Sequence, residues 1–200
     1  MMFWRMMAAI GLCSLLVPEA SANRRTALAI EADYTASVLV FRVGRVSLNA
    51  DLGSDRYAAR AHVQAAGLAA LFTDFSIDSD VEGQFAQGHP VPVNYGHIER
   101  TGDKTRVVDV DFESGVAHST ASPAFSSWGD PPASEADRTG VVDPMTATLL
   151  LSELVAATGG APCEGAIPVF DGKQRYDLNL VSRGTENIRT RGYRGEVLVC

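Results

Sequence analysis

Hydrophobic and polar residues alternate along most of the chain, which is the pattern of β-strands that bury one face. Valine and phenylalanine alternate with three carboxylates over residues 108–113, and the same period of two runs through residues 57–64 and 71–85. Residues 27–48 form a longer valine-rich stretch, in which Gly44 suits a bend or a bulge. The pattern therefore predicts a fold made mainly of strands.

Turn-forming residues separate these segments. Asp-Leu-Gly-Ser-Asp at residues 51–55 predicts a turn, and Gly-Asp at 102–103 and Asp-Gly at 171–172 predict tight hairpins. Residues 114–141 are rich in serine, proline, glycine and aspartate, so we expect a long surface loop there. After the last hairpin turn, residues 175–181 and the approach to the final cysteine favour two further strands.

One segment has the period of a helix instead. Asp143 can accept hydrogen bonds from the free amides of a first helical turn, and Pro144 suits the first helical position. The apolar stripe of this helix consists of Met145, Leu149, Leu150 and Leu154. The glycine pair at 159–160 ends it. We therefore expect one principal helix, packed on an antiparallel sheet.

The N-terminal residues carry the pattern of a secretory signal. Arg5 supplies a positive charge, residues 8–17 are apolar, and Ala-Ser-Ala at 20–22 gives a small-residue cleavage site. The apolar run is shorter than the roughly 20 residues that a membrane-spanning helix needs. We therefore expect residues 1–22 to be removed and residues 23–200 to form a single β-rich domain in the periplasm, without a membrane span.

The charge of the chain argues against one class of partner. It has 17 lysines and arginines against 24 aspartates and glutamates, a net charge of −7, and its basic residues form no run. Affinity for a phosphate backbone comes mainly from clustered lysine and arginine. Nucleic acid is therefore not an expected partner.

Two cysteines remain after removal of the signal, Cys163 and Cys200. In an oxidising compartment such a pair tends to form a disulfide. The bridge would close a loop of 37 residues, which corresponds to about 4 kcal/mol of loop entropy. Two free buried thiols are the alternative, and a metal site is disfavoured because neither cysteine has a second cysteine or a histidine at ligand spacing.

The residues that most often carry catalysis show no recognised spacing. The four histidines are His62, His89, His97 and His118. Asp109, Asp111 and Glu113 form a carboxylate row that could hold a hard cation, although a solvated strand face is the simpler interpretation. Hydrolase motifs such as Gly-x-Ser-x-Gly and Ser-x-x-Lys do not occur. We therefore predict no catalytic residue, no metal site and no cofactor.

Two stretches in the C-terminal third resemble a known family. They are Asp-Pro-Met-Thr-Ala at 143–147 and Val-Phe-Asp-Gly-Lys-Gln-Arg-Tyr-Asp-Leu at 169–178, the latter between the two cysteines. Together they resemble the bacterial envelope family catalogued as domain of unknown function 3108. The resemblance implies an exported, mainly β domain without assigned catalytic residues. It also implies an open, half-wrapped barrel, in which a strongly curved antiparallel sheet folds over one principal helix and leaves an apolar groove.

Members of that family usually continue with further strand past the second cysteine, whereas this chain stops at Cys200. We therefore expect either a fragment or a missing last strand. The candidate binding residues are Asp171, Arg175, Tyr176 and Asp177. In a strand Arg175 and Asp177 share a face, so an ion pair is the structural interpretation and ligand binding the functional one. The small residues at 65–70 either admit a close helix or leave space for a ligand.

These observations favour an exported, non-enzymatic protein that binds a lipid, an acyl chain or a polypeptide in a concave sheet, or that maintains the envelope. An apolar cavity open to solvent would support this hypothesis, and a filled interior would contradict it. One alternative is a structural partner of other envelope proteins, which would use a sheet edge or the 114–141 loop. Another is a hydrolase of envelope glycans or lipids, which requires a carboxylate or histidine with a strongly shifted pKa in a cleft.

Overall fold

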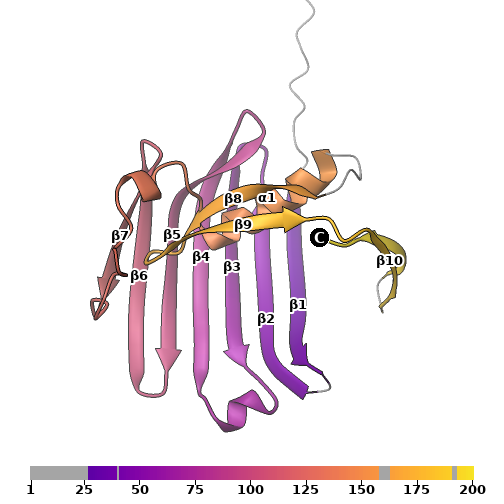
Figure 1. Cartoon of the computed structure of the whole chain (residues 1–200), viewed down its shortest axis with the longest axis horizontal. Coiled ribbons are helices and arrows are strands. Elements are labelled where there is room, and N and C mark those ends of the chain that lie inside the picture. The colour runs from indigo at the N-terminus through magenta and orange to yellow at the C-terminus, as the bar shows by residue number, and fades with distance from the viewer. Residues whose placement is uncertain (1–26, 40, 158–162, 191–192) are drawn as a thin grey trace, which may run out of the picture.

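A computed structural model of the chain describes residues 27–39, 41–157, 163–190 and 193–200 (Figure 1). The predicted signal at 1–22 and the glycine pair at 159–160 lie outside the described residues. Most of the described chain is strand, with one long helix and two short 3-10 turns. The predicted mainly β fold with one principal helix is therefore confirmed.

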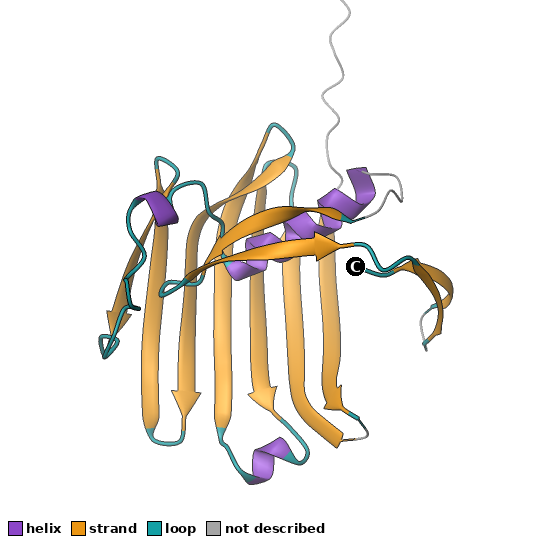
Figure 2. Ribbon diagram, in the orientation of Figure 1, coloured by secondary structure: helices purple, strands orange, loops and turns teal. Residues whose placement is uncertain are grey.

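Seven strands form one antiparallel sheet in which each strand pairs with its neighbours in sequence. They are β1 (Leu28–Val38), β2 (Phe41–Leu52), β3 (Arg56–Ala65), β4 (Phe75–Ala86), β5 (His89–Thr101), β6 (Lys104–Glu113) and β7 (Val116–Ser122). The two edges, β1 and β7, do not pair with each other, so the curved sheet stays open (Figure 2). The open antiparallel sheet is as predicted.

The N-terminal part of the sheet differs from the sequence prediction. Residues 27–48, expected as one long strand, are divided between β1 and β2 by a turn that contains Leu39. That turn carries none of the glycine, asparagine or aspartate residues that normally mark a hairpin, which is why the pattern missed it. Gly44 lies beside an irregularity in the β1–β2 register at Ala36 and Ser37, in agreement with a bulge.

Two predicted segments also need correction. The segment 114–141 was expected to be a loop throughout, but its first part is strand β7, and residues 136–138 form a 3-10 turn, η2 (Ala136–Arg138). The strand expected over 71–85 begins only at Phe75, because a second 3-10 turn, η1 (Ala69–Leu71), precedes it. The hairpins at 102–103 and 171–172 are present as predicted.

Helix α1 (Pro144–Ala157) crosses one face of the sheet, which we call the inner face (Figure 2). Strands β8 (Glu164–Phe170) and β9 (Arg175–Val181) form a hairpin that lies over the helix. Met145 and Leu149 of the helix pack on the sheet core, whereas Leu150 and Leu151 pack with Val169 of the hairpin. The fold therefore has three layers: sheet, helix and hairpin.

A buried hydrogen-bonded chain fixes the start of the helix to the sheet. The Asp143 carboxylate accepts hydrogen bonds from the amides of Met145 and Thr146, at 2.8 and 2.9 Å, and from the Thr146 hydroxyl. Because that hydroxyl has only one proton, the Tyr57 hydroxyl donates to it, at 2.7 Å. The Tyr57 ring lies over Gly83 of β4, where a β-carbon would be only 2.2 Å from it.

The C-terminal hairpin, β10 (Thr185–Arg189) and β11 (Arg194–Leu198), pairs only with itself within the described residues and stands beside the sheet (Figure 1). Cys163 and Cys200 form a disulfide, with 5.8 Å between their Cα atoms. The predicted pairing is therefore present. It connects the end of this hairpin to the start of β8.

No helix in the described parts of the chain has both the length and the apolar character needed to cross a membrane.

Candidate functional site

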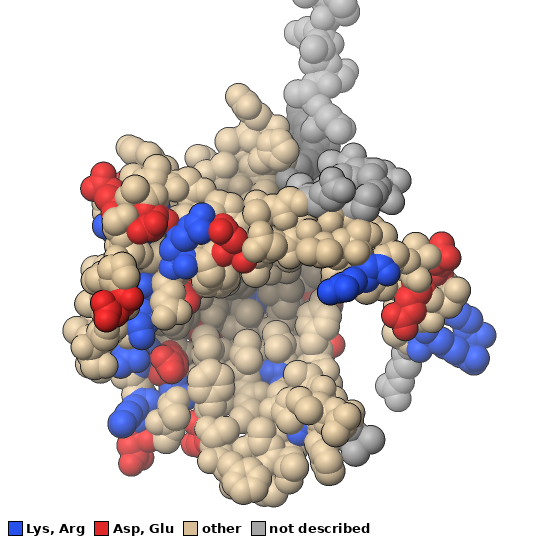
Figure 3. All heavy atoms as spheres, in the orientation of Figure 1, with Lys and Arg blue, Asp and Glu red and all other residues tan. Residues whose placement is uncertain are grey.

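One end of the inner face is left open by the two layers above it (Figure 2). Strands β1 to β6 contain 10–13 residues each, so at about 3.3 Å per residue they are roughly 33–43 Å long. A helix with its side chains is only about 10–12 Å wide. Because α1 and the β8–β9 hairpin run across the strands near one end, the other end stays uncovered. Figure 3 shows the surface hollowed below the hairpin.

The strand register arranges the inner-face residues in rows across the sheet. The covered row, which lies under the helix, consists of Ile30, Ala50, Ala59, Val81, Tyr95 and Val110. The small row lies two residues further along each strand, on the same face, and contains Ala32, Leu48, Ala61 and Ser79. The open row, a second step away, contains Tyr34, Val46, Val63 and Ile77.

Burial falls from row to row. The members of the covered row on β2 to β6 are less than 8% exposed, whereas Val46, Val63 and Ile77 of the open row are half-buried and belong to neither core cluster. Tyr34, at the β1 end, is 57% exposed. Three of the four small-row side chains on β1 to β4, those of Ala32, Ala61 and Ser79, are short, so the surface lies lower there than at the open row. We call the small and open rows together the hollow.

The hollow is apolar over β1 to β4, and its open row becomes polar over β5 and β6. The open row continues there as Glu99 and Arg106, whose charged groups lie 3.6 Å apart. Arg106 also lies over the ring of Phe125, at 4.6 Å from its centre, and donates a hydrogen bond to the carbonyl of Pro123. The small row continues on β5 as His97. The arrangement suits an elongated ligand with one polar end.

His97 is the histidine of the hollow. Its Nδ1 atom is buried and has no hydrogen-bond partner among the described residues, and its ring lies 5.6 Å from the ring of Tyr95. Burial lowers the pKa of His97, although the carboxylates of Asp171, Glu99 and Asp109 act in the opposite direction. The folded protein therefore holds this side chain in its neutral form at a pH at which an unfolded chain would begin to protonate it.

Acidification should consequently destabilise the fold through His97. Below the unfolded pKa of about 6.5 the unfolded state binds a proton that the folded state does not. The unfolding free energy should therefore fall as the pH falls from about 7 to 5, by at most about 1.4 kcal/mol per pH unit from this group. When the unfolding free energy from urea titrations is plotted against pH over this range, its slope should be smaller in His97→Gln than in the wild type. The matched variant His118→Gln, at an exposed position of β7, should keep the wild-type slope, and equal slopes in all three proteins would contradict the assignment.

The candidate binding residues predicted from the sequence lie around the β8–β9 turn and not in the hollow. The Asp171 carboxylate accepts hydrogen bonds from the amides of Lys173 and Gln174, at 2.8 and 2.7 Å, and so closes the turn. Tyr176 is 37% exposed, and burial, helped by the charges of Asp171 and Asp143, raises the pKa of its hydroxyl. The structure thus gives Asp171 a clear structural role.

Arg175 and Asp177 form the ion pair expected from their spacing, with 2.7 Å between Nη1 and Oδ2. Arg175 also borders a cleft of about 480 Å³ between this turn and the segment before η2. The cleft is lined mainly by Trp128, Pro131, Pro132, Asp137, Lys173 and Gln174. Its charges are mixed, because two basic side chains face acidic ones across it. Ligand binding by these four residues remains a prediction.

Asp143 is the buried carboxylate that sequence analysis assigned to the helix start, and the structure agrees. Burial raises the pKa of this carboxyl, against the opposing effect of the hydrogen bonds from Thr146 and Met145. Its side chain has no exposed surface, so no substrate can reach it in this conformation. The shifted pKa therefore reflects the anchoring of the helix and gives no support to a hydrolase.

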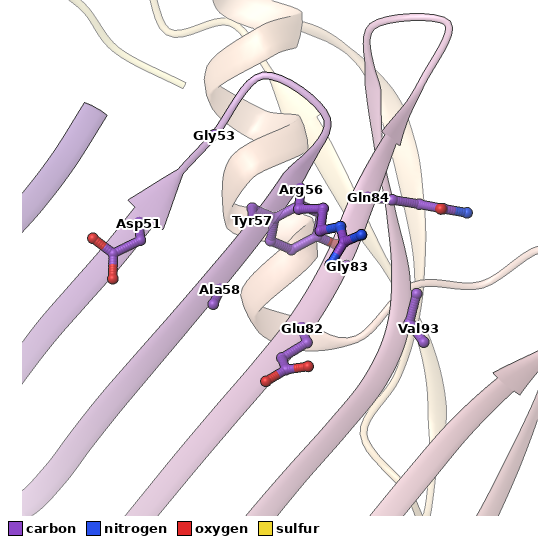
Figure 4. Close-up of a pocket in the computed structure, with 9 residues that line it drawn as sticks. All are labelled: Asp51, Gly53, Arg56, Tyr57, Ala58, Glu82, Gly83, Gln84 and Val93. Atoms are coloured by element: carbon purple, nitrogen blue, oxygen red, sulfur yellow. The ribbon is translucent and has the colours of Figure 1, made fainter. Parts of the chain in front are cut away.

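The opposite, outer face of the sheet holds a shallow cavity of about 600 Å³ (Figure 4). Asp51 of β2 and Glu82 of β4 lie on either side of Ala58, and Arg56 precedes Ala58 on β3. Two acidic side chains and one basic side chain line the cavity, and no described element covers it. The cavity therefore has the character of a solvated strand face.

The remaining predicted polar residues lie on the same outer face. His62 is hydrogen-bonded to Asp78 at 2.6 Å, and Arg100 bonds the second oxygen of that carboxylate. Both contacts, that with His62 first, lower the pKa of Asp78. Asp109, Asp111 and Glu113 are exposed. Among the described residues, no group of three or more histidine, cysteine or carboxylate side chains is placed to hold a metal ion.

The hollow escaped sequence analysis because its residues come from six strands. Sequence analysis identified the alternation over residues 57–64 and the small residues at 65–70. The hollow instead lies at Ala32 and Ala61, which only the strand register places in the same row of the sheet. The position of the helix along the strands decides which row is covered. No local pattern carries that information.

The comparisons with known proteins agree with the resemblance seen in the sequence. A family model described as "Protein of unknown function (DUF3108)" matches residues 33–200. Neither the curated proteins nor the solved structures contain a match. The matched range includes most of the sheet, the helix, both C-terminal hairpins and the two disulfide cysteines. The chain therefore belongs to the DUF3108 family.

Proposed function

We propose that the protein is an exported, periplasmic binding protein that holds a single acyl chain in the hollow of its inner face. The observation that carries this proposal is the half-buried, apolar open row of Val46, Val63 and Ile77, which neither helix nor hairpin covers. The row beside it holds the short side chains of Ala32, Ala61 and Ser79 together with Leu48. The disulfide supports an oxidising compartment, since such bonds persist mainly in exported proteins.

The shape and chemistry of the hollow favour an acyl chain over a globular ligand. Each buried methylene contributes about 0.8 kcal/mol, so a chain that lies across β1 to β4 needs no polar contact for affinity. At the β5–β6 end, Arg106 and Glu99 are placed to contact a polar head group. A polypeptide would need partners for its backbone amides, which the apolar side of the hollow does not offer.

Filling the hollow should weaken binding. Ala61→Trp places a large ring in the small row, so its affinity for the fluorescent fatty acid cis-parinaric acid should fall at least about tenfold. Ala58→Trp is the matched control, because Ala58 lies on the same strand but faces outward. It should bind cis-parinaric acid as the wild type does. A fluorescence titration of the three proteins measures the three affinities.

The titration can contradict the proposal in two ways. Wild-type protein that does not bind cis-parinaric acid, or Ala61→Trp protein that binds it with unchanged affinity, would rule out the hollow as an acyl site. Urea unfolding of both tryptophan variants confirms that each is folded under the conditions of the titration. Competition with unlabelled palmitate shows that the probe occupies a fatty-acid site.

A further inference from the structure

Six large apolar side chains are exposed together at the end of the sheet that the helix leaves uncovered. We call them the apolar tip: Val38, Leu39, Phe41, Leu68, Leu71 and Phe72. The first three belong to the β1–β2 hairpin and the others to the connection that contains η1. Backbone hydrogen bonds from Ala66 to Val43 and from Leu68 to Arg42, each 3.1 Å, hold the two segments side by side. Figure 3 shows uncharged atoms gathered at this end.

The degree of exposure is unusual for such residues. Leu39, Phe72 and Leu71 are 92, 85 and 75% exposed. Hairpin turns normally use polar residues and glycine, and large exposed apolar patches mark interaction sites. Leu39 also has a φ of +56°, in the left-handed region that bulky residues rarely adopt. The hairpin therefore keeps a leucine outward at a conformational cost that an asparagine or glycine would avoid.

The form of the tip fits a lipid bilayer. Its side chains project from the ends of long strands instead of lining a groove, so they can enter the boundary between head groups and acyl chains, as amphipathic anchors do to a depth of about 5–10 Å. Arg42 and Arg45 follow the tip on β2 and are exposed, where anionic head groups would meet them. Asp74 is the exposed acidic residue that follows η1 on the other segment.

We propose that the apolar tip docks the protein on the surface of a lipid bilayer by inserting these side chains. The strands that carry the tip also carry the open row, so a docked protein presents the hollow to the membrane. The inference goes beyond acyl binding in the hollow and does not require it. Because the whole chain has a net charge of −7, attraction of the whole molecule to anionic lipid cannot replace insertion.

Flotation with vesicles of phosphatidylethanolamine and phosphatidylglycerol tests the proposal. The wild-type chain should float with the vesicles, and the double variant Leu71→Ser/Phe72→Ser should partition at least about tenfold more weakly. The matched control is Val91→Ser/Val93→Ser, which removes two exposed valines from the far end of β5 and should float like the wild type. All three proteins must share the same N-terminus, confirmed by intact mass. Flotation should persist at about 0.5 M salt, which screens adsorption by charge.

A second measurement covers the case in which the double variant is poorly folded. In Phe72→Trp, the emission of the new tryptophan should shift to shorter wavelength when vesicles are added, because the indole leaves water. No shift, or wild-type protein that stays unbound, would overturn the proposal. A third outcome would also overturn it: the wild type does not float but forms dimers without vesicles, and the double variant Leu71→Ser/Phe72→Ser abolishes those dimers. The tip would then bind a second copy of the chain. Cis-parinaric acid titration with Ala61→Trp tests the hollow independently.

Discussion

Gly172→Ala should lower the unfolding free energy by about 2–5 kcal/mol, the sum of a backbone and a packing effect. Gly172 has a φ of +97° in the β8–β9 turn, a conformation that L residues avoid. It is also buried against the sheet, where a β-carbon would lie 2.5 Å from Cγ1 of Val108 and 3.1 Å from Cγ2 of Val110. The turn touches the sheet directly, and Phe170 beside it packs in the same core, so neither partner can move without opening that core.

A second glycine separates the two effects. Gly184 has a similar φ of +87°, but no atom of the described residues lies within 4 Å of where its β-carbon would be. Gly184→Ala should therefore show only the backbone cost, about 1–2 kcal/mol. Urea unfolding followed by circular dichroism gives both values. Equal losses in the two variants would show that the turn does not press on Val108, and would contradict the packing of the hairpin described above.

Loss of the disulfide should have a comparable effect. The bond between Cys163 and Cys200 closes a loop of 37 residues, and its removal in Cys163→Ala/Cys200→Ala should cost about 4 kcal/mol. Because the β10–β11 hairpin pairs with no other described strand, this bond is its main tether apart from the chain itself. Reduction should therefore also release the hairpin.

Two measurements distinguish these consequences. Chemical unfolding should give a high unfolding free energy for the oxidised protein. The reduced protein and the double alanine variant should both give a lower one. Hydrogen exchange should show that amides of residues 185–198 lose protection on reduction, while those of β3 to β5 retain it. Unchanged stability on reduction would mean that the covalent link does not constrain the unfolded chain as assumed.

Much of the fold follows from local patterns. The alternation over 57–64 and 108–113 correctly identified which side chains face the core, because a strand with one buried face needs a period of two. The start of the helix was predictable from Asp143 and Pro144, since the free amides of a first turn require an acceptor. The Arg175–Asp177 pair followed from residue spacing alone.

The errors have physical causes too. The β1–β2 turn was missed because Leu39 adopts a left-handed conformation that the sequence gives no reason to expect. Strand β7 was hidden in a polar segment, since an edge strand needs few apolar residues. The hollow and the tip are properties of register and of helix placement, which depend on contacts distant in sequence. Sequence analysis predicted a concave apolar face, and its candidate ligand contacts, Asp171, Arg175, Tyr176 and Asp177, lie at the β8–β9 turn and stay a prediction.

The order of the strands has a consequence for how the chain folds. Because every strand of the seven-stranded sheet pairs with its immediate predecessor, the sheet can grow hairpin by hairpin as the polypeptide emerges, with low contact order. The helix and the β8–β9 hairpin, which cover Val81 and Tyr95, come later in the chain. Until about residue 170 has emerged, a nearly complete sheet exposes its future core, and this interval is when the nascent protein most needs protection from aggregation.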